Sequence, residues 1–492
     1  MLQNFQKYIE KNSEYGVAVE VHHPLVIVEG LPHAQINEKV IFDTEQTGFV
    51  MGLERNKVEI LLLDQEPVPI RCKVARTGEK ISVAVGSALL GSSVNALGEL
   101  LDSAHTIKHE ETREIEQLPP TIIERSKITK QLISNIAIVD LLLPLTFGQR
   151  SVVIGDRKTG KTSLLLQLVK AQTEQNTIVV FAAVGKRWAD LRQMTDFFAT
   201  QVKKENLVFV VSASHEAPGL IYLAPFTAMT IAEYFRDQGR DVLVILDDLS
   251  THAHFYREFS LLAKRFPGNE SYPGDMFYTH ARLLERAGNF KTKDGKTASI
   301  TCLAAAETVD NRVTSTIISN LISMTDGHIL FDSRIFNSGR RPAIDYSLSV
   351  SRVGGKVQTE TQRDVRRRII AILTQYAITS RYTNFGAELG EMAQETMRQG
   401  EQFFALFSQS TNTRVPYSVQ IVISGMLLAG WMKDVLPENI VGAFRDRYSA
   451  LYYEKENYRQ TFRKIAMITD FKEFEKALAG QKDVLFALSG KA

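Results

Sequence analysis

The sequence has little that would mark a secreted, disulfide-bonded or membrane-spanning protein. It contains two cysteines among 492 residues, and the spacing of Cys72 and Cys302 suggests neither a disulfide framework nor a zinc site. The longest apolar stretch, residues 419–432, is interrupted by polar residues and is shorter than the ~20 residues of a membrane span. Residues 1–14 are polar and mixed in charge, which predicts no secretory signal. We therefore expect a reducing compartment, with any membrane association made through partners.

The sequence also lacks a large excess of positive or negative charge. The chain has 58 basic and 56 acidic residues, so its net charge is only +2. Because the chain has no strong positive field, its overall charge does not predict binding to nucleic acid or to an anionic membrane. A hydrophobic fraction of 44% and a charged fraction of 23% are ordinary for packed globular proteins, which excludes a disordered or fibrous chain. At ~150 residues per domain, the length predicts about three domains.

Residues 1–78 are predicted to form an antiparallel β-barrel. From Tyr15 to Gly78, short apolar runs alternate with turns, and no helical period interrupts them. Many short strands without helices are typical of a small barrel or sandwich. The strand-like runs are residues 17–21, 25–28, 40–42, 58–62 and 70–74.

Residues 79–358 are predicted to form an α/β domain, and residues 359–492 a helical domain. In the central part, apolar runs alternate with longer segments, as in buried parallel strands joined by helices. After Gly355 the strand signals fade, and Val365 and Ile369 begin a helical spacing. The predicted central strands are residues 151–154, 177–184, 207–212, 242–247, 299–304 and 328–331.

One motif in the central part predicts phosphate binding. Residues 155–162 match G-x-x-x-x-G-K-[ST], and they follow a predicted strand and open a predicted helix. The glycines let backbone N–H groups surround phosphate oxygens, and the helix amino terminus adds its positive dipole end. Lys161 is expected to reach the β- and γ-phosphates, and the Thr162 hydroxyl to bind Mg²⁺. The predicted nucleotide-binding residues here are Gly155, Asp156, Arg157, Lys158, Thr159, Gly160, Lys161 and Thr162.

A carboxylate at the end of a later strand supports the motif. The apolar run before Asp247 and Asp248 predicts a buried strand that ends in an acid. Such a carboxylate can hold the water shell of Mg²⁺, so Asp247 is the second predicted metal residue, through water. Either acid taken alone is equally well explained as a strand end or a helix cap. The alternative for residues 155–162 is a strand-to-helix turn that binds no ligand. The complete motif, between a predicted strand and a predicted helix, disfavours this alternative.

Several longer motifs resemble the alpha subunit of the F-type ATP synthase family. The resemblance is colinear from about Tyr15 into the helical domain. It rests on residues 155–162, 247–250, 272–275 with His280, 282–286, 336–339, 341–344 and 349–355.

The resemblance implies a barrel, a RecA-like nucleotide domain and a helical domain. It also implies an alternating hetero-hexamer with beta-like catalytic subunits around a central rotary stalk. A peripheral stalk or membrane sector would complete the complex, and the chain would lie in the cytoplasm, on the inner face of the membrane through these partners. The implied ligand is ATP or ADP with Mg²⁺, and no nucleic acid is expected.

The resemblance also implies roles for residues outside the phosphate loop. Arg352 would be an arginine finger offered to the neighbouring beta-like subunit, where a guanidinium stabilises the transferring phosphoryl group. An exposed arginine in a glycine-flanked loop is the alternative for Arg352 if it is taken alone. The adenine pocket would be lined by Phe336, Arg341, Pro342 and, with a less clear match, Gln409.

Lys186 predicts that this chain does not hydrolyse nucleotide. Catalytic beta subunits of the family carry a water-orienting glutamate at the matching position, and alpha subunits usually carry glutamine. A charged lysine cannot accept a proton or an O–H bond from water. Lys158 is a second departure, since the alpha loop normally has glutamine there, and it adds a positive charge to the loop.

Three other functions compete with this interpretation. An alpha-like subunit of a repurposed rotary motor would carry the same motifs and serve a process other than ATP synthesis. A catalytic export ATPase would need a glutamate in place of Lys186. A RecA-like nucleic-acid translocase would need a basic barrel groove with stacking aromatics, whereas residues 17–74 carry Phe42 and Phe49 among many acids.

Overall fold

The structure is a computed structural model, and it describes residues 2–101, 110–292, 294–383 and 390–490. The chain divides into two compact units. The first comprises residues 1–127, 148–153 and 172–325, and the second comprises residues 128–147, 154–171 and 326–492.

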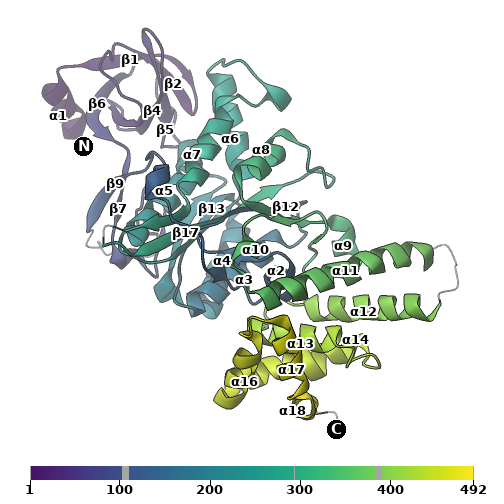
Figure 1. The fold of residues 1–492 in the computed structure, drawn as a ribbon. Helices are drawn as coiled ribbons and strands as arrows, with labels where there is room; N and C mark the ends of the chain where they lie inside the picture. Colours follow the sequence, from purple (N-terminus) through teal and green to yellow (C-terminus); the bar gives the residue numbers. More distant parts are fainter. Residues whose placement is uncertain (1, 102–109, 293, 384–389, 491–492) are drawn as a thin grey trace. The chain divides into compact units, whose positions relative to one another are not determined.

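A closed six-stranded barrel forms the amino-terminal part of the first unit, which confirms the predicted barrel (Figure 1). Its strands are joined in the order β1-β2-β5-β4-β3-β6, and helix α1 precedes them. Inward-facing aliphatic residues, Phe42 and Cys72 fill its core. The elements are α1 (Leu2–Asn12), β1 (Tyr15–His22), β2 (Leu25–Glu29), β3 (Glu38–Phe42), β4 (Thr47–Leu53), β5 (Lys57–Leu62) and β6 (Lys73–Lys80).

The barrel aromatics that a nucleic-acid translocase would present are buried. Phe42 is 0% exposed and Phe49 is 1% exposed. Phe49 stacks on Tyr222, with 6.1 Å between ring centroids. Because both rings are packed inside the protein, neither offers a face on which a base could stack.

A parallel sheet forms the centre of the first unit, in the strand order β12-β17-β15-β13-β14-β8. The pairs β13–β14, β13–β15 and β15–β17 are all parallel, as predicted from their apolar runs. The strands in this order are β8 (Ser93–Val94), β12 (Arg150–Gly155), β13 (Ile178–Lys186), β14 (Leu207–Ala213), β15 (Val242–Asp247) and β17 (Thr297–Glu307), and β16 (Gly288–Lys291) pairs antiparallel with β17. Strands β7 (Ser82–Val85) and β9 (Glu111–Glu114) form a separate antiparallel pair.

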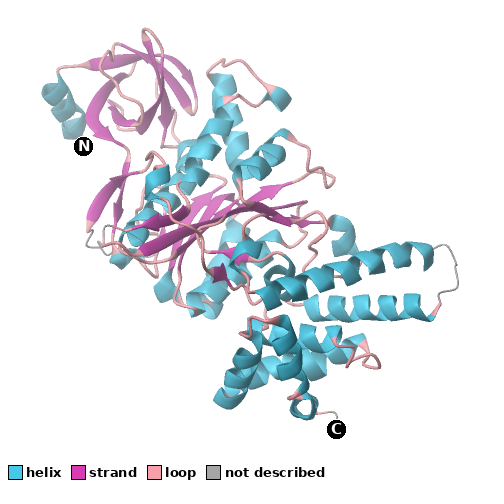
Figure 2. Ribbon diagram, viewed as in Figure 1, coloured by secondary structure: helices cyan, strands magenta, loops and turns pink. Residues whose placement is uncertain are grey.

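Helices connect the strands of this sheet (Figure 2). The α-helices of the unit after α1 are α4 (Trp188–Gln201), α5 (Pro218–Asp237), α6 (Leu249–Leu262), α7 (Asp275–Glu285) and α8 (Thr316–Met324). Short 3₁₀ turns are η1 (Ser87–Leu89), η2 (Ile122–Glu124), η3 (Lys204–Asn206) and η4 (Asn269–Ser271).

The second unit contains the phosphate-loop segment and the carboxy-terminal helices. From residue 352 onward, every regular element that the structure describes is a helix (Figure 2). Two short antiparallel pairs precede these helices, β10 (Gln131–Leu132) with β11 (Leu145–Thr146) and β18 (Gly327–Phe331) with β19 (Val350–Ser351). The helices are α2 (Ala137–Leu142), α3 (Lys161–Glu174), α9 (Ser333–Asn337), α10 (Gly354–Val357), α11 (Glu360–Thr383), α12 (Glu391–Phe407), α13 (Tyr417–Leu428), α14 (Pro437–Asn439), a π-helix η5 (Ile440–Asp446), α15 (Arg447–Glu454), α16 (Glu456–Ala466), α17 (Phe471–Ala479) and α18 (Lys482–Leu488).

Helices α11 and α12 run side by side in the second unit (Figure 1). The predicted apolar positions Val365 and Ile369 of α11 are each 0% exposed, as is Leu373 one turn further on. Close packing depends on Gly400 in α12, since a β-carbon there would lie 2.3 Å from Cδ2 of Tyr376. No helix among the described residues is long and apolar enough to cross a membrane.

Both cysteines are buried, free thiols, as expected from their spacing. Cys72 lies in the barrel core, where burial raises the pKa of its thiol to about 11. Cys302 lies in β17, where burial raises the pKa of its thiol to about 12.

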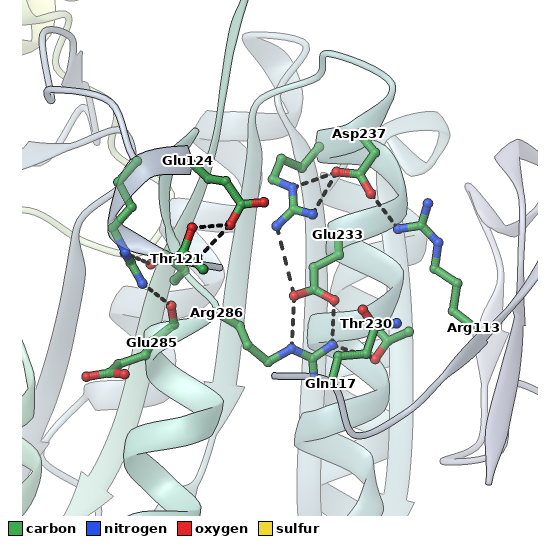
Figure 3. Close-up of polar contacts among 12 residues, drawn as sticks. Arg113, Gln117, Thr121, Glu124, Thr230, Glu233, Asp237, Glu285 and Arg286 are labelled. Carbon is green, nitrogen blue, oxygen red and sulfur yellow. Dashed lines mark hydrogen bonds and ion pairs between the residues drawn. The ribbon is translucent and has the colours of Figure 1, made fainter. Parts of the chain in front are cut away.

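A buried ion pair joins α5 to the end of α7 (Figure 3). The Arg286 side chain is 1% exposed, and its Nε and Nη2 donate to the two Glu233 oxygens at 2.9 and 2.6 Å. Nη2 also donates to Thr230 Oγ1 at 2.7 Å, and Nη1 donates to the Ile115 carbonyl at 2.9 Å. The guanidinium therefore holds together two helices and the segment that follows β9.

We predict that Arg286→Met destabilises the chain by about 3–5 kcal/mol, because Glu233 stays buried without its bidentate partner. Replacing both residues, Arg286→Met with Glu233→Leu, is expected to restore most of the loss. Urea unfolding of the two variants and the native chain measures both effects. A double variant no more stable than the single one would contradict this account of the ion pair.

Asp140 of α2 is a buried carboxylate in the second unit. Its Oδ1 accepts hydrogen bonds from the backbone N–H and hydroxyl of Ser134, and its Oδ2 accepts one from Gln420 Nε2 at 3.0 Å. Desolvation outweighs these donors and raises the pKa of Asp140 to about 6. The folded chain therefore holds the Asp140 proton more tightly than the unfolded chain does.

This raised pKa predicts a specific pH dependence of stability. The contribution of Asp140 is complete below its ordinary pKa of 3.8 and is lost as the pH rises through about 6. We expect the stability of the native chain, relative to Asp140→Asn, to fall by about 3 kcal/mol across this window. The check is the difference in urea midpoint between the two proteins, measured across that window. A constant difference would show that Asp140 has an ordinary pKa in the folded chain.

Candidate nucleotide-binding site

The phosphate loop has the backbone that its sequence predicts. Gly160 has φ +106° and Lys158 has φ +63°, so both lie in the left-handed region. A β-carbon on Gly155 would lie 2.6 Å from the Phe331 carbonyl oxygen, so only glycine fits against β18. The loop ends at Lys161, where α3 begins. A loop of this kind turns backbone N–H groups and a helix amino terminus toward an anion.

Two cationic side chains of the loop are exposed, and the third is buried. Arg157 and Lys158 lie at the surface. Lys161 is 7% exposed, and its Nζ donates to the carbonyls of Gly155 and Asp156, both at 2.7 Å. Thr159 Oγ1 also donates to the Asp156 carbonyl at 2.7 Å, while Thr162 follows in the first turn of α3. The loop is thus shaped by its own side chains before any phosphate arrives.

Asp247, the last residue of β15, and Asp248, which follows it, have different roles. Asp248 is the N-cap of α6, because its carboxylate accepts a hydrogen bond from Thr251 N at 2.7 Å. The helix-cap interpretation therefore applies to Asp248. Asp247, 1% exposed, lies opposite Ala183 in the parallel register of β15 and β13.

Lys186, at the end of β13, binds these acids directly. Its Nζ lies 2.9 Å from Asp247 Oδ1 and 4.0 Å from Asp248 Oδ2. Burial alone would lower the pKa of Lys186, but attraction to Asp247 and Asp248 outweighs it and raises the pKa. Burial raises the pKa of Asp248, against the lowering effect of Lys186. Lys186 is therefore an ammonium ion, as the sequence predicts.

The contact with Lys186 places a positive charge beside the Asp247 carboxylate. One carboxylate oxygen already accepts from an ammonium, and that positive charge would repel a divalent cation held nearby. Two unit charges about 4 Å apart repel by about 1 kcal/mol in water and about 4 kcal/mol near a protein surface, and a doubly charged ion doubles both figures. Among the described residues, no group of three or more His, Cys, Asp or Glu side chains could hold a metal. The water-mediated Asp247 contact to Mg²⁺ stays a prediction.

Three of the four predicted adenine-pocket residues lie together in the second unit. The guanidinium of Arg341 stacks 3.5 Å above the ring of half-buried Phe336 and donates to the Phe336 carbonyl at 2.6 Å. Pro342 and Arg341 line a cavity of about 40 Å³ together with Arg340 and Phe404. The Arg340 guanidinium stacks 3.7 Å above the Phe404 ring. Both stacked arginines would have to shift before an adenine ring could enter this small cavity.

Gln409, the fourth predicted adenine-pocket residue, forms hydrogen bonds to backbone groups and is not among the residues that line this cavity. It is 4% exposed; its Oε1 accepts from Ala137 N at 2.6 Å, and its Nε2 donates to the Asn135 carbonyl at 3.0 Å. Its own backbone N–H donates to the Arg341 carbonyl at 2.8 Å. A contact between Gln409 and a base is still only a prediction, whereas its support of the Arg341 segment is direct.

Arg352 lies on an anchored loop. Its side chain is exposed, and its backbone N–H donates to the Asp326 carbonyl at 3.0 Å. Next to it, Ser351 Oγ donates to the Pro144 carbonyl at 2.7 Å, and a β-carbon on Gly354 would lie 2.0 Å from the same oxygen. An exposed guanidinium on a fixed backbone is what an arginine finger requires.

Sequence reasoning missed Arg340 and Phe404, which complete the small cavity with residues it had found. The only sequence signal was the run of two arginines before Pro342 and the aromatic pair at Phe403 and Phe404. Their pairing depends on the approach of α12 to the segment after α9, which a single sequence does not specify.

The phosphate loop, which follows strand β12 and opens helix α3, defines a P-loop nucleotide-binding protein. Two family models match the chain: the nucleotide-binding domain of the ATP synthase alpha/beta family over residues 135–351, and the C-terminal domain of the ATP synthase alpha/beta chain over residues 358–480.

Curated relatives are similar over most of the chain. The ATP synthase subunit alpha 2 of Burkholderia thailandensis is 38% identical over 88% of this chain and 78% of its own length. The ATP synthase subunit alpha of Clostridium botulinum is 34% identical over 94% of this chain and 92% of its own length. The ATP synthase subunit alpha 3 of Paraburkholderia xenovorans is 37% identical over 88% of this chain and 82% of its own length. The chain therefore belongs to the ATP synthase alpha/beta family, among the alpha subunits of its F-type members.

We predict that Gly354→Ala loosens the Arg352 loop, because the added methyl group cannot coexist with the Pro144 carbonyl oxygen. Hydrogen exchange at the Arg352 amide should become at least about tenfold faster, which corresponds to a loss of about 1.4 kcal/mol in local opening free energy. Gly355→Ala is the matched control, since its β-carbon would meet only the end of the Arg366 side chain, at 3.3 Å. Equal exchange rates in the two variants would contradict the proposed anchoring.

Proposed function

We propose that this chain is a nucleotide-holding, non-hydrolysing alpha subunit. It alternates with beta-like catalytic subunits in a hetero-hexamer around a central rotary stalk. The observation that carries the proposal is the Lys186 ammonium, which stands where a hydrolysing subunit needs a carboxylate and donates 2.9 Å from Asp247. A group with no free lone pair cannot orient or deprotonate an attacking water.

The ligand in this proposal is ATP or ADP with Mg²⁺. The loop of residues 155–162 surrounds the phosphates, Lys161 contacts the β- and γ-phosphates, and the Thr162 hydroxyl is the metal ligand within the loop. Phe336, Arg341 and Pro342 bound the base, with Gln409 behind them. These roles follow from the motif and from family membership together.

Arg352 acts in trans in the same proposal. Its guanidinium stabilises charge on the phosphoryl group at a neighbouring beta-like subunit, so the chain contributes to a reaction that it does not itself carry out. The expected location is the cytoplasmic, inner face of the membrane, reached through stalk and membrane-sector partners. The predicted domain limits, residues 1–78, 79–358 and 359–492, would correspond to barrel, nucleotide domain and helical domain.

We predict that the purified chain binds Mg-nucleotide but turns it over negligibly. Lys161→Ala should weaken binding at least about 100-fold, because it removes the charge that faces the phosphates. Lys170→Ala is the control, since it removes the same charge nine residues later on α3, about 13 Å along the helix. Equilibrium titration with a fluorescent nucleotide and a phosphate-release assay measure the two properties. Steady hydrolysis by the isolated chain would overturn the non-hydrolysing role.

The proposed role of Arg352 as an arginine finger is tested in the assembled hexamer. Arg352→Ala should leave assembly and nucleotide content nearly unchanged while lowering ATP turnover by about 10³-fold or more. Arg352→Lys keeps the charge but loses the planar fork, so it should recover only a small part of the rate. Turnover and bound nucleotide are measured on the same preparations. Unchanged turnover in Arg352→Ala would assign this arginine to a solvated loop.

A further inference from the structure

The small cavity that Pro342 lines belongs to the same unit as the phosphate loop. Gly155 of the loop lies against the Phe331 carbonyl oxygen at the end of β18, and α9 and the cavity residues follow this strand. On the other side, Gln167 of α3 donates from its Nε2 to the Ser410 carbonyl at 2.7 Å, two residues after the last residue that lines the cavity. The cavity walls are thus connected to the phosphate loop on two sides, as a base site requires.

Two arginines supply hydrogen-bond donors at this cavity. Arg340 and Arg341 both line it, and they stack on the rings of Phe404 and Phe336. Neither guanidinium forms an ion pair with a carboxylate of the described residues, and Arg340 donates no hydrogen bond to that part of the chain. A guanidinium carries five N–H donors and no acceptor. The donors of Arg340 can therefore be used by a ligand.

The main acceptors around the cavity already accept hydrogen bonds from the protein. The Arg340 carbonyl accepts from Arg341 Nη1, and the Arg341 carbonyl accepts from Gln409 N, both at 2.8 Å. The Ser408 carbonyl accepts from Nη1 of Arg445, a buried residue of η5. The Gln409 amide oxygen accepts from the first backbone N–H of α2 at 2.6 Å. The cavity thus has more to offer a base that accepts hydrogen bonds than one that donates them.

Purine bases differ in this respect. Guanine and hypoxanthine present two neighbouring acceptors, O6 and N7, whereas adenine presents N7 beside an amino group at N6. A guanidinium pairs with O6 and N7 through two N–H groups, but it meets the adenine amino group donor to donor. The cavity volume is about 40 Å³, close to the ~30 Å³ share of one water molecule, so a base enters only when a stacked arginine leaves its ring. The displaced guanidinium then lies beside the base that replaces it.

We infer that Arg340, with Arg341, makes this cavity a base site for 6-oxo purines, so that guanine nucleotides bind more tightly than adenine nucleotides. The base stacks on the exposed aromatic face, and the planar fork of Arg340 pairs with its O6 and N7. The inference rests on the proposed nucleotide-holding function and specifies the preferred base of that site. ADP still binds through its phosphates, with lower affinity.

The test is displacement of a ribose-labelled fluorescent ADP from the purified full chain in the presence of Mg²⁺. The competitors are unlabelled ADP, GDP and IDP. We expect GDP and IDP to bind at least about tenfold more tightly than ADP, as one bidentate pair between arginine and a 6-oxo purine provides. IDP shares O6 and N7 with GDP but lacks the 2-amino group, so similar affinities of GDP and IDP identify the 6-oxo edge as the recognised feature.

Three variants assign the preference to a side chain. Arg340→Met keeps an apolar stem over Phe404 and removes the donors, so the three affinities should then agree within about threefold. Arg340→Lys keeps the charge without the planar fork and should also lose most of the preference. Arg367→Met is the matched control, because it removes an equal charge from an exposed side chain of α11 outside the cavity and should keep the preference. Binding of ADP by each variant shows that the chain is folded.

The outcomes are distinguishable. ADP that binds the native chain as tightly as GDP and IDP would overturn the inference and leave the nucleotide-holding function intact. A preference for GDP that IDP does not share, or one that persists in Arg340→Met, would also overturn it. Failure of labelled ADP and labelled GDP alike to bind would overturn both the inference and the proposed function. A preference shared by GDP and IDP and lost in both Arg340 variants would establish Arg340 as the residue that selects the base.

Discussion

The parallel pairing of β13 and β15 is the constraint on which the site at this sheet edge depends. Their buried residues face apolar neighbours on both sides, so the register leaves little freedom to slip. A fixed register makes both strands end together, and the polar residues at these ends must then satisfy one another. In this chain the result is an ammonium ion on a carboxylate, Lys186 on Asp247.

Hydrogen bonds to side chains fix one segment in each unit. The Arg286 guanidinium joins α5 and α7 to the segment after β9, and the Ser351 hydroxyl and Pro144 carbonyl fix the loop that carries Arg352. In contrast, Arg341 and Arg340, which stack over Phe336 and Phe404, are exposed side chains. The Arg352 loop is thus held at its backbone, whereas the arginines at the small cavity are exposed.

The sequence predicted most of the fold because long apolar runs and the phosphate-loop motif depend on local patterns. Strands β13 and β15 were found at nearly their observed limits. Strand β4 was missed because Gly48 and Gly52 interrupt its apolar pattern, yet β-carbons there would lie 2.6 Å from Ile60 and 2.2 Å from Glu59. The charge of Lys186 was predicted, but its contact with Asp247 was not, since it spans 61 residues and depends on the irregular end of β13.

The two buried thiols have a practical consequence for studying the subunit. A thiolate is the reactive form of cysteine, and pKa values of about 11 for Cys72 and about 12 for Cys302 leave almost none of it near neutral pH. Both sulfurs are also covered by the core. A single cysteine introduced at an exposed position can therefore be labelled with a maleimide dye in the native background, without first removing the two natural cysteines.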